Sequence, residues 1–178
     1  MQTLKPICAA APLALALALA VPADAQAGND KARLKGGAEN PPVISFGEGF
    51  FEAKFRDDRI PFRLSYKGLA NPDTGSDVTQ VHLHVANPSI NGGITVYLCT
   101  NLGNTPPGAT VRPCPPSPGN VSGDIVAADV QAVPPSIGAG DLVGLRKLIE
   151  DGSIYVNDHT DDFPGGEIRG QINNANER

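Results

Sequence analysis

Hydrophobic and polar residues alternate in short segments along most of the chain. In residues 60–66, for example, the large hydrophobic side chains occupy every second position. A period of two is the period of a β-strand, whose successive side chains point to opposite faces. The pattern predicts strands at residues 32–36, 46–55, 60–66, 78–86, 94–99, 124–133, 153–160 and 167–173.

One segment has a different period. Between residues 141 and 150 the hydrophobic residues fall at helical spacing, at Leu142, Leu145, Leu148 and Ile149. Asp141 is placed to cap the start of a helix, and Gly152 is placed to end it. We therefore expect one short helix late in the chain.

The segments between the predicted strands consist of turn-forming residues. The sequence of 178 residues contains 20 glycines and 17 prolines, which disfavour long helices. Clear turn clusters lie at residues 56–59, 71–75 and 161–166. Regularly spaced short strands predict an all-β domain, either an antiparallel β-sandwich or an open Greek-key barrel, with one short helix.

The N-terminal segment differs from the rest of the chain. Lys5 precedes an apolar run at residues 8–21, and Ala23-Asp24-Ala25 follows it. This order predicts a signal peptide over residues 1–25, cleaved near Ala25. The alternative, an uncleaved membrane anchor, is disfavoured because the run is short for a bilayer. We expect a flexible tail at residues 26–31, one domain at 32–175, and a secreted or periplasmic mature chain without a membrane span.

The charge of the chain limits its partners. The formal net charge is −5, and it stays −5 without residues 1–25 because that segment carries one lysine and one aspartate. The sequence has no basic run, so we expect neither nucleic acid nor an anionic membrane as partner. An unknown protein or a surface polymer is the expected partner.

Two cysteines remain after the predicted cleavage, Cys99 and Cys114. Export would place them in an oxidising compartment, where such a pair usually forms a disulfide. Their spacing matches neither a redox motif nor a zinc motif. We therefore expect a structural disulfide that closes a loop rich in proline and glycine.

Three histidines are the main candidates for chemistry. His82 and His84 alternate with hydrophobic residues, so both should lie on the outer face of their strand, and His159 should do the same on another strand. The same alternation points the other polar candidates, Asn157, Glu167 and Arg169, outward to solvent. Imidazoles are good ligands for copper and zinc, so the three histidines are a candidate metal site. The alternative is that they are ordinary surface residues.

Other catalytic signatures are missing from the sequence. It has no G-x-S-x-G or H-E-x-x-H motif and no phosphate-binding glycine loop, so we assign no catalytic residue and do not expect an enzyme. Asp161 and Asp162 are interpreted as turn residues rather than as calcium ligands. Asn120 begins an N-glycosylation sequon, which matters only in a eukaryotic secretory route.

Several motifs resemble the CHRD (chordin) domain family. They lie at residues 34–42, 81–84, 91–93, 155–160 and 164–172, and the last is the most specific. The segment 101–120 is longer than this family leads us to expect. The resemblance implies an extracellular or periplasmic β-sandwich of immunoglobulin-like architecture. In chordin, similar domains belong to a secreted protein that binds growth factors, but this chain lacks the cysteine-rich modules of chordin, so that role does not transfer.

A more distant likeness is to copper-zinc superoxide dismutase, which has a sandwich of similar architecture. The likeness implies that His82, His84 and His159 hold copper and that Arg169 guides an anion. If these histidines bind copper, we expect Asn157 or Glu167 to orient them. The sequence has no further histidines to match the bridging and zinc ligands. We expect an exported binding or structural protein without catalysis; the alternative is a copper-binding protein for storage, delivery or redox chemistry.

Overall fold

The computed structural model describes residues 29–69 and 77–174, so the expected signal peptide and the turn at 71–75 lie outside the described residues. The strands are β1 (Asn29–Lys35), β2 (Glu48–Lys54), β3 (Ile60–Lys67), β4 (Val78–Val85), β5 (Gly93–Thr100), β6 (Gly119–Ile125), β7 (Ile154–Thr160), β8 (Ile168–Gln171) and β9 (Asn173–Asn174). The helical elements are α1 (Leu142–Glu150) and two short 3-10 turns, η1 (Gly36–Ala38) and η2 (Ala127–Asp129).

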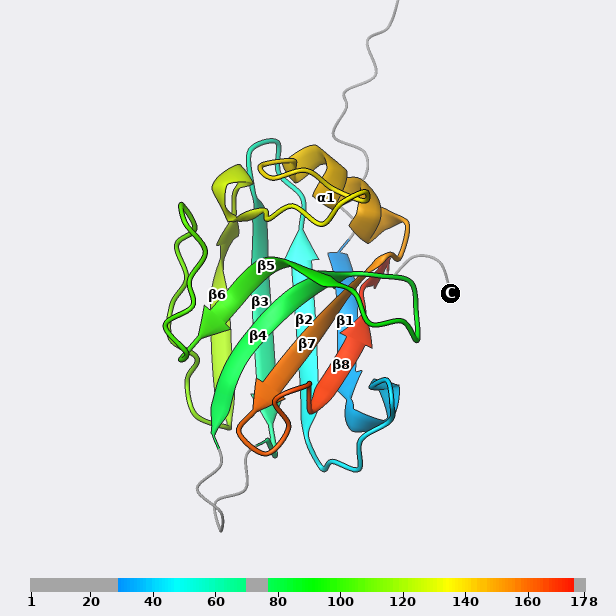
Figure 1. Cartoon of the computed structure of the whole chain (residues 1–178), viewed down its shortest axis with the longest axis vertical. Helices are drawn as coiled ribbons and strands as arrows, with labels where there is room; N and C mark the ends of the chain where they lie inside the picture. The colour runs from blue at the N-terminus through cyan, green and yellow to red at the C-terminus, as the bar shows by residue number, and fades with distance from the viewer. Residues whose placement is uncertain (1–28, 70–76, 175–178) are drawn as a thin grey trace, which may run out of the picture.

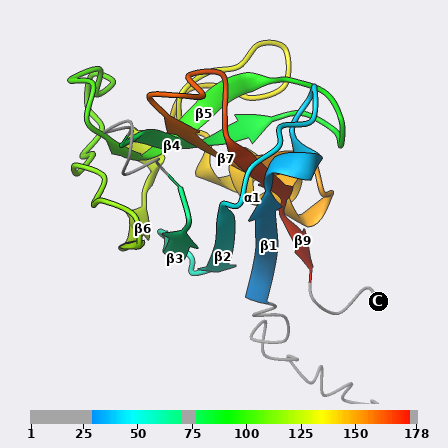
Figure 2. The ribbon, with the colours of Figure 1, turned by 90° about the horizontal axis from the view of Figure 1, so that it is seen from below.

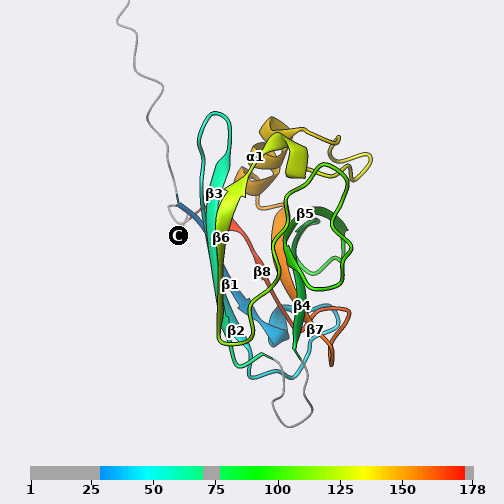
Figure 3. The same cartoon turned by 90° about the vertical axis from the view of Figure 1, so that its left-hand side faces the viewer.

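The strands form one antiparallel sheet in the order β5-β4-β7-β8-β1-β2-β3-β6, with β9 pairing β1. The sheet curls on itself, so that β1, β2, β3 and β6 make one layer and β4, β5 and β7 make the other (Figures 1 and 3). The predicted all-β class with one helix is confirmed, in the form of an open barrel.

The hydrophobic core lies between these two layers. Every second residue of β3 points into it, and the same alternation holds in β2. In β4 the core residues are Val78, Val81, Leu83 and Val85. The helix α1 lies across one end of the barrel and buries Leu145 and Ile149 there (Figures 1 and 2). Its start is capped as predicted, because the Asp141 carboxylate accepts a 2.7 Å hydrogen bond from the Gly144 N–H.

Two sequence-based boundaries were wrong. The strand expected at 124–133 lies at β6, because its inward positions include Gly119 and Gly123, which give no hydrophobic signal. The first strand begins at Asn29, so residues 29–31 belong to β1 and not to a flexible tail. The inward residue there is Asp30, which hides the alternation that would reveal a strand.

The predicted disulfide between Cys99 and Cys114 is present. It fastens the loop after β5 to that strand. Asn101 strengthens the attachment, because its amide donates to the Cys114 carbonyl at 3.1 Å and accepts from the Cys114 N–H at 3.0 Å. Among the described residues, no helix has the length and hydrophobicity needed to cross a membrane.

Candidate metal centre

The three histidines lie on two neighbouring strands, β4 and β7. In the antiparallel register His82 faces Asn157, His84 faces Tyr155, and His159 faces Gln80. His159 is therefore a diagonal neighbour of His82 on one face of the sheet, and diagonal neighbours are within reach of long side chains. The alternation predicted from the sequence places the imidazoles on the correct side, away from the core.

The prediction that these histidines face solvent was wrong. His82, His84 and His159 are 0%, 7% and 6% exposed. Segments outside the sheet lie over this side. The backbone at Gly92 hydrogen-bonds to the ring of His84, and the backbone at Pro164 hydrogen-bonds to the ring of His159. A period of two shows on which side of a sheet a residue lies, but it does not show whether loops cover that side.

The imidazole nitrogens converge. One ring nitrogen from each histidine lies within 4.8 Å of the other two. A metal ion with bonds of about 2.0 Å needs ligand nitrogens roughly 3.3–3.5 Å apart, so closing the site takes side-chain movements of about 1 Å. The strand β5 bulges beside both His82 and His84, and such bulges re-aim side chains at functional sites.

Two histidines are held with one nitrogen free. The Nδ1 of His84 lies 3.0 Å from the Gly92 carbonyl oxygen, and the Nδ1 of His159 lies 3.0 Å from the Pro164 carbonyl oxygen. A carbonyl can only accept, so each Nδ1 carries the proton and each Nε2 presents a lone pair. Both Nε2 atoms are buried without a hydrogen-bond partner, as are both ring nitrogens of His82.

The three rings are neutral at physiological pH. Burial lowers the pKa of His82 to about 2, and the neighbouring His159 and His84 lower it further. Burial also lowers the pKa of His84 to about 4 and lowers the pKa of His159, although the Gly92 and Pro164 carbonyls oppose these shifts. Neutral imidazole is the form that binds metal ions.

Arg169 contributes to the site through Tyr155. The Arg169 guanidinium carbon lies 3.9 Å from the centre of the Tyr155 ring, and that ring stacks on His84 at 4.8 Å. Arg169 also donates to Asn91 Oδ1 at 3.0 Å. It is buried rather than solvent-exposed as predicted, because it is packed beneath the segment that contains Gly92.

Tyr155 also holds the segment that contains Gly92. Its hydroxyl oxygen accepts a 3.1 Å hydrogen bond from the Gly92 N–H. Gly92 thus links the tyrosine hydroxyl to the Nδ1 of His84 through its own N–H and carbonyl. Tyr97 of β5 packs edge-on against His82, with ring centres 4.4 Å apart. No pattern in the sequence indicated these contacts, although Gly92 and Pro164 fall in motifs that resemble the family.

The positions of Glu167 and Asn157 do not match their predicted orienting roles. Glu167 is buried, and its carboxylate accepts from Ser45 Oγ at 2.6 Å and from Thr160 Oγ1 at 2.8 Å. Asn157 is also buried, and its Oδ1 has no hydrogen-bond partner. Backbone carbonyls of Gly92 and Pro164 instead hold His84 and His159.

Glu39, from the end of η1, is an acidic neighbour that the sequence did not single out. Its Oε1 lies near Gly166, as the Asn157 amide does, and it has no hydrogen-bond partner. Burial raises the pKa of Glu39 to about 7, although Arg169 lowers it. Glu39 also lines a hollow of about 410 Å³ beside the segments that cover the histidines.

Asp158 lies on the opposite side of β7 from the histidines. It pairs with Val81 and Ile168 on the core side, is fully buried, and has no partner for either carboxyl oxygen. Burial raises its pKa well above the usual range, and the nearby Glu167 adds to the shift. Asp158 therefore lies on the core side of β7, away from the histidines.

A comparison with known protein families agrees with the motifs. No curated protein and no solved structure matches the chain. The sequence model of the CHRD domain matches residues 31–172, which include every strand from β2 to β8 and the three histidines. The chain therefore belongs to the CHRD domain family.

Proposed function

We propose that this protein binds one copper ion through His82, His84 and His159, for storage, delivery or redox chemistry. The observation that carries the proposal is the pair of carbonyl contacts that fix the protons on Nδ1 of His84 and His159. These contacts leave the Nε2 atoms of both rings buried without a hydrogen-bond partner, in a group whose ligand nitrogens lie within 4.8 Å of one another. A ring held by a backbone carbonyl on one nitrogen is the usual arrangement of a metal-binding histidine.

The ligand set favours copper over the other common ions. Three neutral nitrogens suit copper and zinc, but zinc with three protein ligands takes a water as its fourth ligand, and these histidines are shielded from solvent. Among the described residues, the group of converging metal-binding side chains contains only the histidines. A singly charged ion is also less costly to bury than a doubly charged one, which favours Cu(I) in a site so shielded from solvent.

An exported location supports the proposal. We infer that residues 1–25 are a signal peptide cleaved near Ala25 and that the domain makes up most of the mature chain. CHRD domains occur in extracellular or periplasmic proteins. The disulfide between Cys99 and Cys114 fits the oxidising conditions of either place.

The test is a copper titration of the mature protein, followed by calorimetry and by competition with a chelator, under reducing and oxidising conditions. The wild type should bind one copper ion per chain. His84→Ala should weaken binding by about a hundredfold or more, because two imidazoles remain. Gln80→Ala is the matched control, since Gln80 lies on the same strand and face and faces His159. It should bind as the wild type does.

The outcome can contradict the proposal in two ways. Equal and weak copper binding by the wild type and His84→Ala would mean that the histidines do not form a site. Equal losses in His84→Ala and Gln80→Ala would mean that damage to β4, and not loss of a ligand, explains the effect. Thermal unfolding of the metal-free variants tells these cases apart.

A further inference from the structure

The layer formed by β1, β2, β3 and β6 has an outward face that no described segment covers (Figure 3). Its outward charged residues are Lys31, Arg33, Lys35, Lys54, Arg63 and Lys67, against Glu48, Glu52 and Asp124. The face therefore carries six cations and three anions, whereas the whole sequence has 14 and 19. The charge of this face is opposite to that of the protein.

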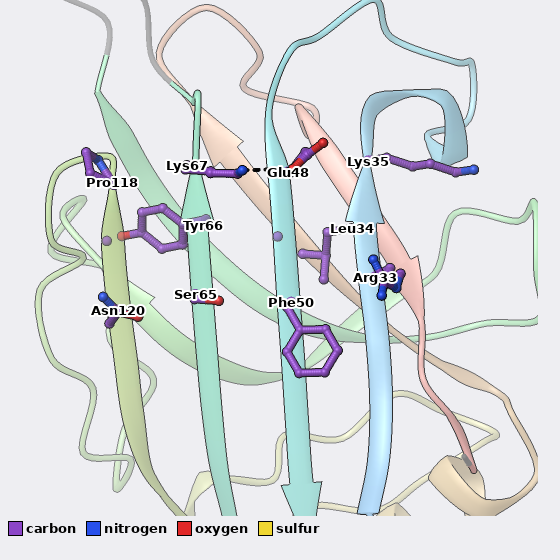
Figure 4. A pocket seen from close by; sticks show the side chains of 12 residues that line it. Arg33, Leu34, Lys35, Glu48, Phe50, Ser65, Tyr66, Lys67, Pro118 and Asn120 are labelled. Atoms are coloured by element: carbon purple, nitrogen blue, oxygen red, sulfur yellow. Dashed lines mark ion pairs between the residues drawn. The ribbon is translucent and has the colours of Figure 1, made fainter. Parts of the chain in front are cut away.

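Part of this face is a shallow hollow of about 480 Å³ (Figure 4). One row of side chains crosses the four strands in register, in the order Arg33, Phe50, Ser65 and Asn120. Ser65 and Asn120 are short, and this leaves the hollow beside the ring of Phe50. That ring is 38% exposed, although Phe50 lies in the middle of a strand.

The next row supplies charges of both signs. Lys35, Glu48 and Lys67 lie across β1, β2 and β3, and Lys67 forms a 3.2 Å ion pair with Glu48 (Figure 4). Both side chains of the pair are exposed to solvent, so each can readily give up its partner for a polar group of a ligand. β1 and β3 are two strand spacings apart, about 10 Å, so the cations at the ends of the row flank the hollow.

These groups fit a sugar ring that carries a carboxylate. An exposed aromatic ring offers an apolar platform for the hydrophobic face of a sugar. Ser65, Asn120 and Glu48 offer hydrogen bonds to hydroxyl groups, and Arg33 offers a forked pair of donors to a carboxylate. A polyanion without sugar rings fits less well, because it would leave the exposed side chain of Phe50 uncovered.

We propose that this face binds an acidic polysaccharide built from uronic-acid sugars. The inference makes the surface polymer expected from the sequence more specific. No basic run exists along the chain, but alternation in β1 and pairing with β2 and β3 gather the cations on one surface. The proposal does not depend on the metal centre, which lies on the opposite layer of the barrel.

The test is affinity electrophoresis of the mature protein, expressed in bacteria, through gels that contain polygalacturonate. Phe50→Ala and Arg33→Ala should each weaken retardation by about tenfold, because one removes the platform and the other the forked donor. Lys147→Ala is the matched control for charge, since Lys147 lies exposed on α1 and pairs with Asp151. It should change retardation by less than about twofold.

Two further probes separate the sources of binding. Dextran, which is neutral, should cause no retardation, and polyglutamate, which is an anionic polymer without sugar rings, should bind at least tenfold more weakly than polygalacturonate. Wild-type protein that polygalacturonate does not retard would overturn the proposal. Equal binding to polyglutamate, with no effect of Phe50→Ala, would also overturn it and would leave a surface that attracts any polyanion. Copper titration of the Phe50→Ala protein should be unchanged.

Discussion

On β4 and β7 the outward side chains His82 and His159 are at most 6% exposed, whereas on β2 and β3 the outward Phe50 is 38% exposed and the side chain of Lys67 is 71% exposed. Both sets point away from the same core and follow the same alternation. The difference arises outside the sheet, because loop segments lie over one layer and none of the described segments lies over the other (Figures 2 and 3).

The comparison shows how one barrel can offer two kinds of site. Covering the imidazoles removes them from water, keeps them neutral and leaves their nitrogens without partners, so a metal ion is the group that would satisfy them. Leaving the other face bare keeps its cations hydrated, so that only an extended, weakly held ligand suits it. The alternation of residues sets the direction of each side chain, and the loops determine its chemistry.

The largest effect expected from this comparison is at His82. His82→Leu should abolish tight copper binding and at the same time raise the unfolding free energy of the metal-free protein by about 1–2 kcal/mol, because two buried nitrogens without partners are removed. On the bare face, Ser65→Leu should change stability by less than about 0.5 kcal/mol. Chemical denaturation of both metal-free variants measures the contrast. A strong loss of stability in His82→Leu would show that the imidazole is a structural part of the fold.

The loop over the histidines should not tolerate a side chain at one of its glycines, Gly166. Gly166 has φ +121°, and a Cβ there would lie 2.6 Å from the Asn157 amide and 2.9 Å from Glu39 Oε1. Gly166→Ala should therefore cost about 2–3 kcal/mol. The neighbouring Gly165 is the control, because a Cβ there meets no atom within 4 Å. Equal unfolding free energies for the two variants would mean that the loop does not pack tightly over this face.

The inner side of the bare layer contains a buried carboxyl group, Asp30. Burial raises the pKa of Asp30 from 3.8 to about 6, and Glu150 on α1 adds to the shift while Arg146 opposes it. Because the folded protein binds this proton more tightly, the stabilising effect is present below about pH 4 and is lost as the pH rises through 6. Asp30→Asn should thus be more stable than the wild type at pH 8, by on the order of 2 kcal/mol.

This prediction about Asp30 is checked by urea unfolding of both proteins at several pH values. The difference in unfolding free energy should be constant above about pH 7 and should shrink between about pH 6 and pH 4. A constant difference across that range would mean that Asp30 does not titrate with a raised pKa. The face exposed to solvent is unchanged in this variant, so polysaccharide binding should not respond.

The smallest expected effect is at Tyr155. Tyr155→Phe removes the hydroxyl that accepts from the Gly92 N–H, while the ring that stacks on His84 stays. We expect a loss of about 1 kcal/mol in unfolding free energy and about tenfold in copper affinity, since the Gly92 carbonyl is less firmly held. Copper affinity equal to that of the wild type would mean that the contact between Tyr155 and Gly92 does not help to position His84.

Much of the fold could be predicted because its signal is local. Alternation in β3 and β4, helical spacing in α1 and the capping residue Asp141 each depend on a few adjacent residues. Prediction failed where an inward position is glycine or a carboxyl group, as in β6 and at Asp30. In those places the tertiary structure, and not the hydrophobic pattern, decides that a strand forms.

The candidate site could be predicted only in part. The identity of the three histidines follows from their alternation and from the family resemblance, and the register of β4 and β7 brings them together. Their burial could not be predicted, because the segments around Gly92 and Pro164 contact the rings through backbone carbonyls. A backbone contact leaves no mark in the pattern of side chains. The gathering of cations at Arg33, Lys35 and Lys67 was missed because it needs the pairing of separate strands.

The central claim is that three buried imidazoles hold one metal ion. X-ray absorption spectroscopy at the copper edge, on protein loaded with one copper ion per chain, tests this claim most directly. We predict three nitrogen neighbours at about 2.0 Å with the outer scattering of imidazole rings, and fewer rings in His159→Ala. A spectrum of oxygen neighbours, or one that is the same in His159→Ala, would contradict the claim.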